Sequence, residues 1–504
     1  MSIERKLLSN TIYLFFDWFV VSILSFSFWF ILAKTLPTKE YGIVTTSINF
    51  IMIISAFSIL GINVALSKLI SELGHKKNFS EAHSYIKMSF KLISIVLLII
   101  SFLLFIFSTQ ISQFLKLPFN SILIIIFSII SITFYTFSGS ILQGFQNMKK
   151  YFITDAFGYF FKISITLFLL FIGFRYLSPL VGFCLSYLFI FVSRLNLVYF
   201  KTKSNSASYK KLFHYALPSL VTSITSSLLG YGNYIILTIL KTPEITGIFA
   251  VAFTLSGLIS ILPNVLASAL FPIISQLSIK QNAKNKQGYL FSLVLRYSIF
   301  LILPISILFL IFSKQAVLLF SSFDYLSATT YFPILIPAAV FVGLSTVFHV
   351  SLYGIGKPKI QRNTIVATTI LFLLLSIPLT IYFSAVGFSM AYLISMMLLF
   401  VLNFIYIRKY LKPKFFIGDI LKILFSSSII ALILYLIQPF IQNVFTLTLI
   451  SIPIGLLYLI LLLLTRFYRF EDTRLLEFFG KRIPFIDKYC VLLSNFIRKN
   501  FISK

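Results

Sequence analysis

Residues 31–73 decide the fold, and they read ILAKTLPTKEYGIVTTSINFIMIISAFSILGINVALSKLISEL. The stretch closes one apolar segment, turns through the polar run 36–42, crosses a long apolar run and leaves through the polar residues 67–72. A bilayer core about 30 Å thick needs about 20 apolar helical residues for each crossing. The stretch therefore predicts a helical hairpin in a membrane.

The same pattern returns at residues 239–277, which read ILKTPEITGIFAVAFTLSGLISILPNVLASALFPIISQL. Gly247 follows Gly42 by 205 residues, and Gly387 follows Gly182 by the same 205 residues. Apolar helices resemble one another by composition, but two matches at one offset are typical of an internal repeat. We therefore predict a duplicated helical bundle, as in many transporters.

The composition excludes an ordinary soluble protein. Of 504 residues, 59% are hydrophobic and 11% are charged, and 42 Lys and Arg residues face 13 Asp and Glu residues for a net charge of +29. The basic residues lie between apolar runs, which indicates membrane topology and contact with anionic lipids rather than nucleic acid. No partner of the nucleic-acid class is expected.

The chain lacks the patterns of a catalytic or metal site. There is no Gly-rich phosphate loop that leads into Lys-Ser or Lys-Thr, and Cys184, Cys490 and four scattered histidines give no metal-ligand spacing. A membrane glycosyltransferase would need a catalytic carboxylate and a sizeable outer loop, and neither is visible. We expect no enzyme activity, no cofactor and no bound metal, although a scaffold without transport stays open as an alternative.

Hydropathy predicts an all-α membrane protein with about fourteen spans. We place the spans at 11–33, 43–66, 92–111, 121–143, 152–173, 179–199, 215–240, 247–270, 290–312, 331–353, 364–383, 386–407, 420–438 and 444–465. Charged linkers divide these into an N-lobe of helices 1–6 (1–206), a C-lobe of helices 7–12 (207–414) and two appended helices (415–466). A basic amphipathic tail (467–504) should lie on the inner membrane surface.

Lys and Arg residues concentrate in alternate loops, on the side that holds both termini. The opposite set of loops holds only Lys34, Lys39, Lys116, Arg175, Lys241 and Lys314. Cytoplasmic loops carry the excess of basic residues in membrane proteins. Both termini should therefore be cytoplasmic, in a multi-pass protein of the cell membrane.

Ionisable residues within spans are candidates for function, because burying a charge at the bilayer centre costs about 2.5–3.5 kcal/mol. Lys162 lies deep in the fifth span and follows Asp155 by seven residues, which places the two on about the same helix face. Arg296 lies about two turns into the ninth span. We predict that these three residues line a substrate cavity. The alternatives are a structural pair for Lys162 and a snorkelling side chain for Arg296.

Three further residues are weaker candidates. Asp17, beside Trp18 in the first span, could couple transport to an ion or mark an interfacial position. Asn233 and His349 could line the cavity or form hydrogen bonds between helices. Arg194 lies close to an inner span end and is interpreted as a topology anchor.

The order of short motifs along the chain resembles the polysaccharide (O-antigen type) flippases of the multidrug/oligosaccharidyl-lipid/polysaccharide (MOP) exporter superfamily. The motifs are Ala33-Lys34-Thr35-Leu36-Pro37 with Glu40-Tyr41-Gly42, Gly61 with Ser67-Lys68 and Glu72, Leu142-Gln143-Gly144 with Lys149-Lys150-Tyr151, Ala216-Leu217-Pro218, Gly247-Ile248-Phe249, Gly354 with Gly356-Lys357-Pro358, and Val386-Gly387. Each motif is loose, but together they cover almost the whole chain. The Ile-, Phe- and Lys-rich composition resembles that of archaeal members.

The resemblance implies two six-helix lobes around a central cavity, with two helices appended. It implies a flippase that moves an oligosaccharide or polysaccharide repeat unit, linked to a polyprenyl or dolichyl (pyro)phosphate, from the inner to the outer leaflet by alternating access. Expected partners are this lipid-linked glycan, membrane lipids and glycan-assembly enzymes. One departure is Asn233, where family members often carry Asp, which puts an ion site there in doubt. A cation-coupled exporter of small amphiphiles on the same fold is the alternative function.

Overall fold

The computed structural model describes residues 3–76, 78–197, 207–278, 284–441, 443–480 and 487–501, and these ranges are helical, without strands. Helices are expected because a chain that crosses lipid has to satisfy its backbone hydrogen bonds within each segment. The predicted all-α fold is confirmed. The predicted lobe boundary at residue 206 and the segment 481–486 of the predicted tail lie outside the described residues.

The chain divides into two compact units, of which the first comprises Met1–Val251, Phe320–Ser327 and Thr369–Phe388. Its helices are α1 (Ile3–Thr35), α2 (Thr38–Ser58), α3 (Ile62–His75), α4 (Phe79–Ile106), α5 (Ser108–Phe114), α6 (Phe119–Gly144), α7 (Met148–Ile172), α8 (Leu177–Ser193) and α9 (Tyr209–Leu240). In this unit α7 packs against α8 and α1, while α9 packs against α2 and α3. The helices α10 (Pro243–Ser278) and α14 (Pro358–Tyr410) contribute to both units.

Twelve helices of the described residues are long and apolar enough to cross a membrane. One of them, α14, has 53 residues and a non-helical turn at Ser384 (φ 54°, ψ −140°), which separates the two predicted spans 364–383 and 386–407. The apolar helix α8, at 17 residues, corresponds to the predicted span 179–199. The described helices thus account for all fourteen predicted segments.

The second predicted span, 43–66, is not one continuous helix. The backbone turns left-handed at Leu60 (φ 52°) and Gly61 (φ 69°), so that α2 ends at Ser58 and α3 begins at Ile62. Glycine adopts this conformation without steric cost. A side chain at Gly61 would also collide with α9, since its Cβ would lie 2.3 Å from the Ala216 carbonyl oxygen.

The repeat seen in the sequence has a direct structural counterpart in the first unit. A Cβ atom added at Gly42 would lie 1.7 Å from the carbonyl oxygen of Pro243, and one added at Gly247 would lie 2.2 Å from that of Thr38. Pro243 follows Thr38 by the same 205 residues that separate the two glycines. The contact is therefore reciprocal, as expected where two copies of one motif meet about a pseudo-two-fold axis.

Lysine ammonium groups cap chain segments in the first unit. Lys116 donates to the carbonyls of Ile239, at 3.0 Å, and Lys241, at the end of α9, and Lys34 donates to the carbonyl of Ser321 at 2.8 Å. Carbonyls at a helix C-terminus lack partners within the helix and carry partial negative charge. The lysines thus satisfy backbone groups that the helix leaves open.

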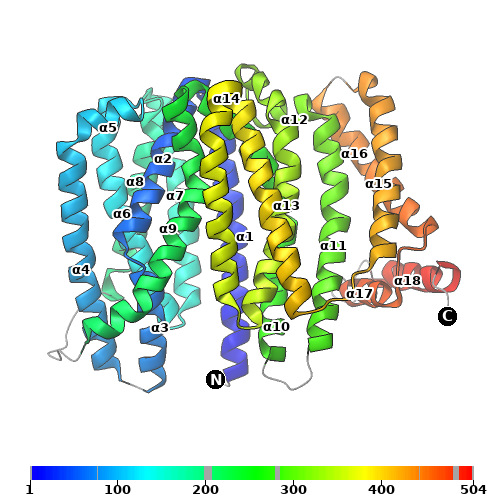
Figure 1. Ribbon diagram of the computed structural model, residues 1–504, viewed down its shortest axis with the longest axis horizontal. Coiled ribbons are helices and arrows are strands. Elements are labelled where there is room, and N and C mark those ends of the chain that lie inside the picture. The colour runs from blue at the N-terminus through cyan, green and yellow to red at the C-terminus, as the bar shows by residue number, and fades with distance from the viewer. Residues whose placement is uncertain are drawn as a thin grey trace. The chain divides into compact units, whose positions relative to one another are not determined.

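The second unit comprises Ala252–Leu319, Ala328–Thr368 and Ser389–Lys504. It contains α11 (Lys284–Ile311), α12 (Ser313–Phe320), α13 (Phe332–Gly354), α15 (Ile417–Ile437), α16 (Val444–Leu464), α17 (Phe470–Gly480) and α18 (Asp487–Phe501). Buried apolar residues of α15 and α16 pack with Phe312 and Phe467 in one cluster. The helices α17 and α18 run across the direction of α15 and α16 (Figure 1), as expected of surface-lying helices in the predicted tail.

Candidate functional site

Lys162 lies in the interior of the first unit, in α7, with 5% of its surface exposed. Its Nζ atom lies 4.5 Å from the ring centre of Phe28 on α1 and 4.3 Å from that of Tyr159, one turn earlier on α7. Among the described residues no carboxylate or hydrogen-bond acceptor contacts this ammonium. Two aromatic faces therefore form its immediate surroundings.

The aromatic surroundings offset only part of the cost of burying a charge. At about 1 kcal/mol for each ring, the two cation–π contacts together contribute about 2 kcal/mol. A charged side chain at the centre of a membrane costs about 2.5–3.5 kcal/mol. The position of Lys162 is thus unfavourable for folding by itself and suited to an anion.

Asp155, about two turns before Lys162 on α7, is paired with Arg194, the residue that follows α8. The Arg194 guanidinium donates to one carboxylate oxygen of Asp155, and the hydroxyl of Tyr135 donates to the other at 3.1 Å. Arg194 also donates to the hydroxyl of Thr154 at 2.9 Å, and both members of the ion pair are buried. The charges of Asp155 and Arg194 cancel, so that Lys162 is left without a counter-charge.

Asp17 lies on α1, which packs against α7. Its carboxylate is within electrostatic range of Asp155 and Arg194, and its Oδ1 atom is buried without a hydrogen-bond partner among the described residues. A buried polar atom without a partner is rare and calls for an explanation. Asp17 therefore has one carboxylate oxygen that accepts no hydrogen bond from the described residues.

Asn233 is fully buried on α9. Its Nδ2 donates to the carbonyl of Leu229 in its own helix at 3.2 Å, while its Oδ1 is buried without a partner among the described residues. The side chain therefore retains one unused acceptor and carries no charge.

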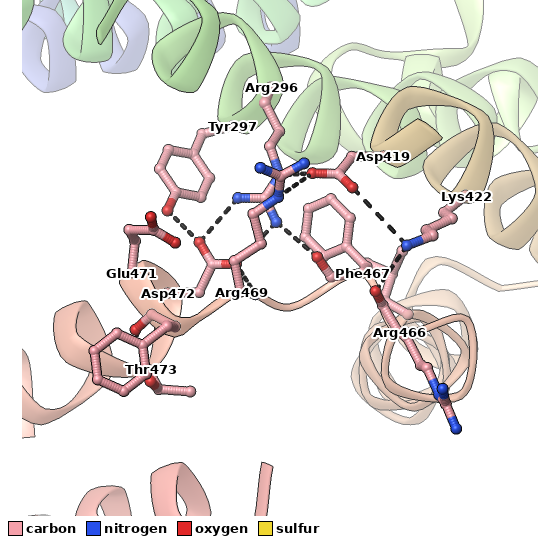
Figure 2. A network of polar contacts seen from close by, with 12 residues as sticks. Arg296, Tyr297, Asp419, Lys422, Arg466, Phe467, Arg469, Glu471, Asp472 and Thr473 are labelled. Atoms are coloured by element: carbon pink, nitrogen blue, oxygen red, sulfur yellow. Dashed lines mark hydrogen bonds and ion pairs between the residues drawn. The ribbon is translucent and has the colours of Figure 1, made fainter. Parts of the chain in front are cut away.

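Arg296 lies in the second unit, on α11, with 1% of its surface exposed, and Figure 2 shows its partners. Its guanidinium lies 2.8 Å from the carboxylates of Asp419 on α15 and Asp472 on α17, and it donates to the carbonyl of Phe467 at 2.8 Å. Arg469 approaches the same Asp419 oxygen at 2.8 Å. Two carboxylates thus oppose the charge of Arg296.

Asp472 receives further donors from the same network (Figure 2). The hydroxyl of Tyr297 and the backbone N–H of Arg469 both donate to its carboxylate. Burial would raise the pKa of Asp472, but the hydrogen bond and the charge of Arg296 outweigh burial and hold this pKa below its ordinary value. The network joins α11, α15 and α17, so it fastens the tail to α11 and to the first appended helix.

His349 lies on α13, and its Nε2 atom lies 3.0 Å from Nδ2 of Asn403 and 3.4 Å from the hydroxyl of Thr364, both on α14. Asn403 is fully buried. These contacts are hydrogen bonds between helices, the second of the two roles expected for His349.

The sequence of the chain matches a known protein family. The family described as "Polysaccharide biosynthesis protein" matches residues 7–278, more than half of the sequence. The chain belongs to this family.

Two archaeal proteins are similar to the chain in sequence. One is the probable low-salt glycan biosynthesis flippase Agl15 of Haloferax volcanii, which is 24% identical over 229 residues. That alignment covers 45% of this chain and 48% of Agl15, so the chain matches about half the length of that relative. The other is the uncharacterized membrane protein MJ1068 of Methanocaldococcus jannaschii, 23% identical over 444 residues, 82% of this chain and 86% of that protein.

Solved structures show the same fold. The lipid II flippase MurJ, in an inward closed conformation, superposes with a TM-score of 0.72 at 19% identity, over 90% of this chain and 98% of MurJ. An inward-facing multidrug resistance MATE transporter of the MOP superfamily superposes with a TM-score of 0.62 at 16% identity, over 78% of this chain and 94% of that one. The fold expected from the resemblance to the MOP superfamily is thus confirmed.

The predicted site residues fall into two groups. Asp17, Asp155, Lys162 and Asn233 lie in the first unit, whereas Arg296 and His349 lie in the second. Asp155, which was predicted to share a helix face with Lys162, forms an ion pair with Arg194.

A cluster of tyrosines that the sequence did not predict includes Tyr159, which contacts Lys162. The hydroxyls of Tyr159 and Tyr187 lie 3.1 Å apart, and the ring of Tyr187 lies 4.8 Å from that of Tyr135. Tyrosine is common in membrane helices and interfaces, so single tyrosines carry no signal in hydropathy. Their meeting across α6, α7 and α8 became visible only in the structure.

Proposed function

We propose that this protein is a flippase that moves a glycan, linked to a polyprenyl or dolichyl (pyro)phosphate, from the inner to the outer leaflet by alternating access. The family of the chain, the flippase names of Agl15 and MurJ and the shared fold support this function. One observation of this chain carries it, namely that the buried ammonium of Lys162 has no counter-charge among the described residues.

Lys162 is the residue to which we assign the phosphate group of the substrate. An anion that entered between Phe28 and Tyr159 would supply the counter-charge that the chain does not, and charge-assisted contacts are roughly twice as strong as neutral ones. One or both rings would have to move to admit it, in keeping with transport that alternates between states. Arg296 is less suited, since Asp419 and Asp472 already oppose its charge.

Asp17 is the residue to which we assign ion coupling. Its carboxylate lies within electrostatic range of the Asp155–Arg194 pair and has one oxygen without a partner among the described residues, so a proton or cation taken up by Asp17 would change the charge balance beside α7. A change in local charge at a packed helix pair is a common origin of conformational switching. Asn233 would contribute its unused Oδ1 as a neutral contact to substrate, and His349 would join α13 to α14.

We place the protein in the cell membrane with both termini in the cytoplasm, because basic residues are concentrated in the loops on that side. Membrane lipids and glycan-assembly enzymes, which would deliver the lipid-linked glycan, are the expected partners. The function is transport without covalent chemistry.

A cation-coupled exporter of small amphiphiles is the second candidate, and the likeness to the MATE transporter is what favours it. The two functions predict opposite substrate charges. A lone cation attracts a phosphate and repels a cationic drug, so the surroundings of Lys162 favour the flippase.

Reconstitution in proteoliposomes tests the proposed function. The purified chain should move a fluorescent undecaprenyl-pyrophosphate-linked disaccharide between leaflets, measured by loss of fluorescence to a reductant outside the vesicles, and should not move the cationic dye rhodamine 6G. Dye transport with no lipid transport would establish the exporter instead, and movement of neither would refute both. A proton gradient should change the rate for the intact chain and leave the rate of Asp17→Asn unchanged.

A further inference from the structure

A polar groove of about 600 Å³ runs between α3 and α6 in the first unit. This volume is within the range of sites for small molecules, about 300–1,000 Å³. The polar side chains that line it are Asn63, Ser67, Lys68, Ser71, Glu72 and Gln143. None of them belongs to the Lys162 region.

Two glycines shape the groove. Gly144 has no side chain where α6 meets α3, and a Cβ atom there would lie 2.7 Å from Cβ of Ile70. The close approach holds the neighbouring Gln143 beside α3. Gly61 lies in the turn that interrupts the helix between α2 and α3, and its carbonyl accepts a hydrogen bond from Ser219 of α9 at 3.0 Å. The walls of the groove are therefore set by backbone packing.

The polar groups of the groove have unused hydrogen-bonding capacity. The Oδ1 atom of Asn63 is buried and has no partner among the described residues. Ser67 and Ser71 form no side-chain hydrogen bond within the described part of the chain. Hydroxyls and carboxamides each offer both donors and acceptors.

The two charged residues in the lining of the groove have opposite charges. Nζ of Lys68 lies 3.8 Å from a carboxylate oxygen of Glu72, one turn later, so the lining carries no net charge. A phosphate would therefore gain little electrostatic attraction in this groove, in contrast to the site at Lys162. Apolar surface is also present, because Val64 in the lining is 51% exposed and the ring of Tyr215 lies 3.9 Å from Nζ of Lys68.

We infer that the groove between α3 and α6 binds uncharged sugar units of the glycan, while Lys162 takes the phosphate of the same substrate. A sugar ring presents hydroxyls that donate and accept, together with apolar C–H faces, and the groove offers a matching set of both. The inference rests on the proposed flippase function for the identity of the glycan. It assigns recognition of the sugar to α3 and α6.

Saturation-transfer NMR on the purified full chain in detergent tests this directly. The probes are the soluble trisaccharides maltotriose, cellotriose and chitotriose, which carry neither lipid nor phosphate. We expect ring-proton signals from at least one probe, about tenfold weaker binding for Asn63→Ala/Gln143→Ala because two neutral hydrogen bonds are lost, and no change for Gln113→Ala. Gln113 is an exposed glutamine on α5 outside the groove.

Several outcomes would overturn the inference. These are the absence of signal from all three probes, equal binding by the double variant whose thermal unfolding matches the intact chain, and displacement of the sugar by inorganic pyrophosphate. The milder variant Gln143→Asn, which keeps the carboxamide and shortens its reach, should bind intermediately and guards against misfolding of the double variant. Because the measurement needs no transport, sugar binding without lipid movement would refute the proposed function alone, and lipid movement without sugar binding would refute this groove alone.

Discussion

Replacing Lys162 by methionine should stabilise the protein and abolish its transport. The change removes a buried ammonium that costs about 2.5–3.5 kcal/mol and loses ring contacts at 4.5 and 4.3 Å that together return about 2 kcal/mol. The methionine sulfur would recover about 0.3–1.5 kcal/mol against the same rings. The net effect is a stabilisation of about 1–3 kcal/mol.

Two measurements on Lys162→Met follow from this balance. Thermal unfolding in detergent should shift upward by about 2 °C or more, and the rate of lipid movement in proteoliposomes should fall about tenfold or further, because a charge-assisted contact of at least about 1.5 kcal/mol is lost. Lys162→Arg should retain part of the transport. Lys91→Met, at an exposed position on α4, should change neither quantity.

The reasoning is refuted by either of two results for Lys162→Met. A lower unfolding temperature would mean that the ammonium holds the helices together. Transport at the rate of the intact chain would mean that no phosphate contacts it.

Three further predictions concern packing and charge. Arg296→Met should lower the unfolding temperature in detergent, since breaking a buried ion pair costs about 3–5 kcal/mol. Arg469→Met should lower it less, because the Arg469 side chain is 39% exposed. Equal effects of the two changes would refute the conclusion that Arg296 is the main cation of the network. Because the pKa of Asp472 is held below its ordinary 3.8, its contribution is complete above that pH and is lost only as pH falls through the lowered pKa. The unfolding temperature should thus fall in strong acid, and this fall should be absent in Asp472→Asn. A fall that begins near pH 6 would contradict this. Gly144→Val should destabilise by about 1–3 kcal/mol through overlap with Ile70, and Ile70→Ala in the same chain should restore part of the unfolding temperature.

Hydropathy predicted the helices well, because each span is a property of one contiguous segment. The polar run 36–42 contains the turn between α1 and α2, and the predicted division of 364–407 falls at Ser384. The break at Gly61 was missed, since residues 43–66 are mostly apolar and a left-handed backbone leaves no trace in hydropathy. A glycine inside an apolar run is ambiguous until the neighbouring helix is known.

The candidate site was predictable only in part. Burial of Lys162 followed from its depth in an apolar span, but the partner of Asp155 lies 39 residues away and that of Arg296 lies 176 residues away. Periodicity relates residues of one helix and contains no information on which helices meet. Arg194 therefore passed for a topology anchor although it is fully buried in an ion pair.

The lysine contacts at chain ends in the first unit bear on how a charged product would leave. Lys34 and Lys116 direct their ammonium groups at backbone carbonyls, and Arg175 lies 3.1 Å from the carboxylate of Glu40. These cations belong to the sparsely basic set of loops. A cation already opposed by a carbonyl dipole or a carboxylate exerts a weaker field at a distance. We therefore expect a pyrophosphate that reaches this side to be held loosely, so that its dissociation from this side is fast.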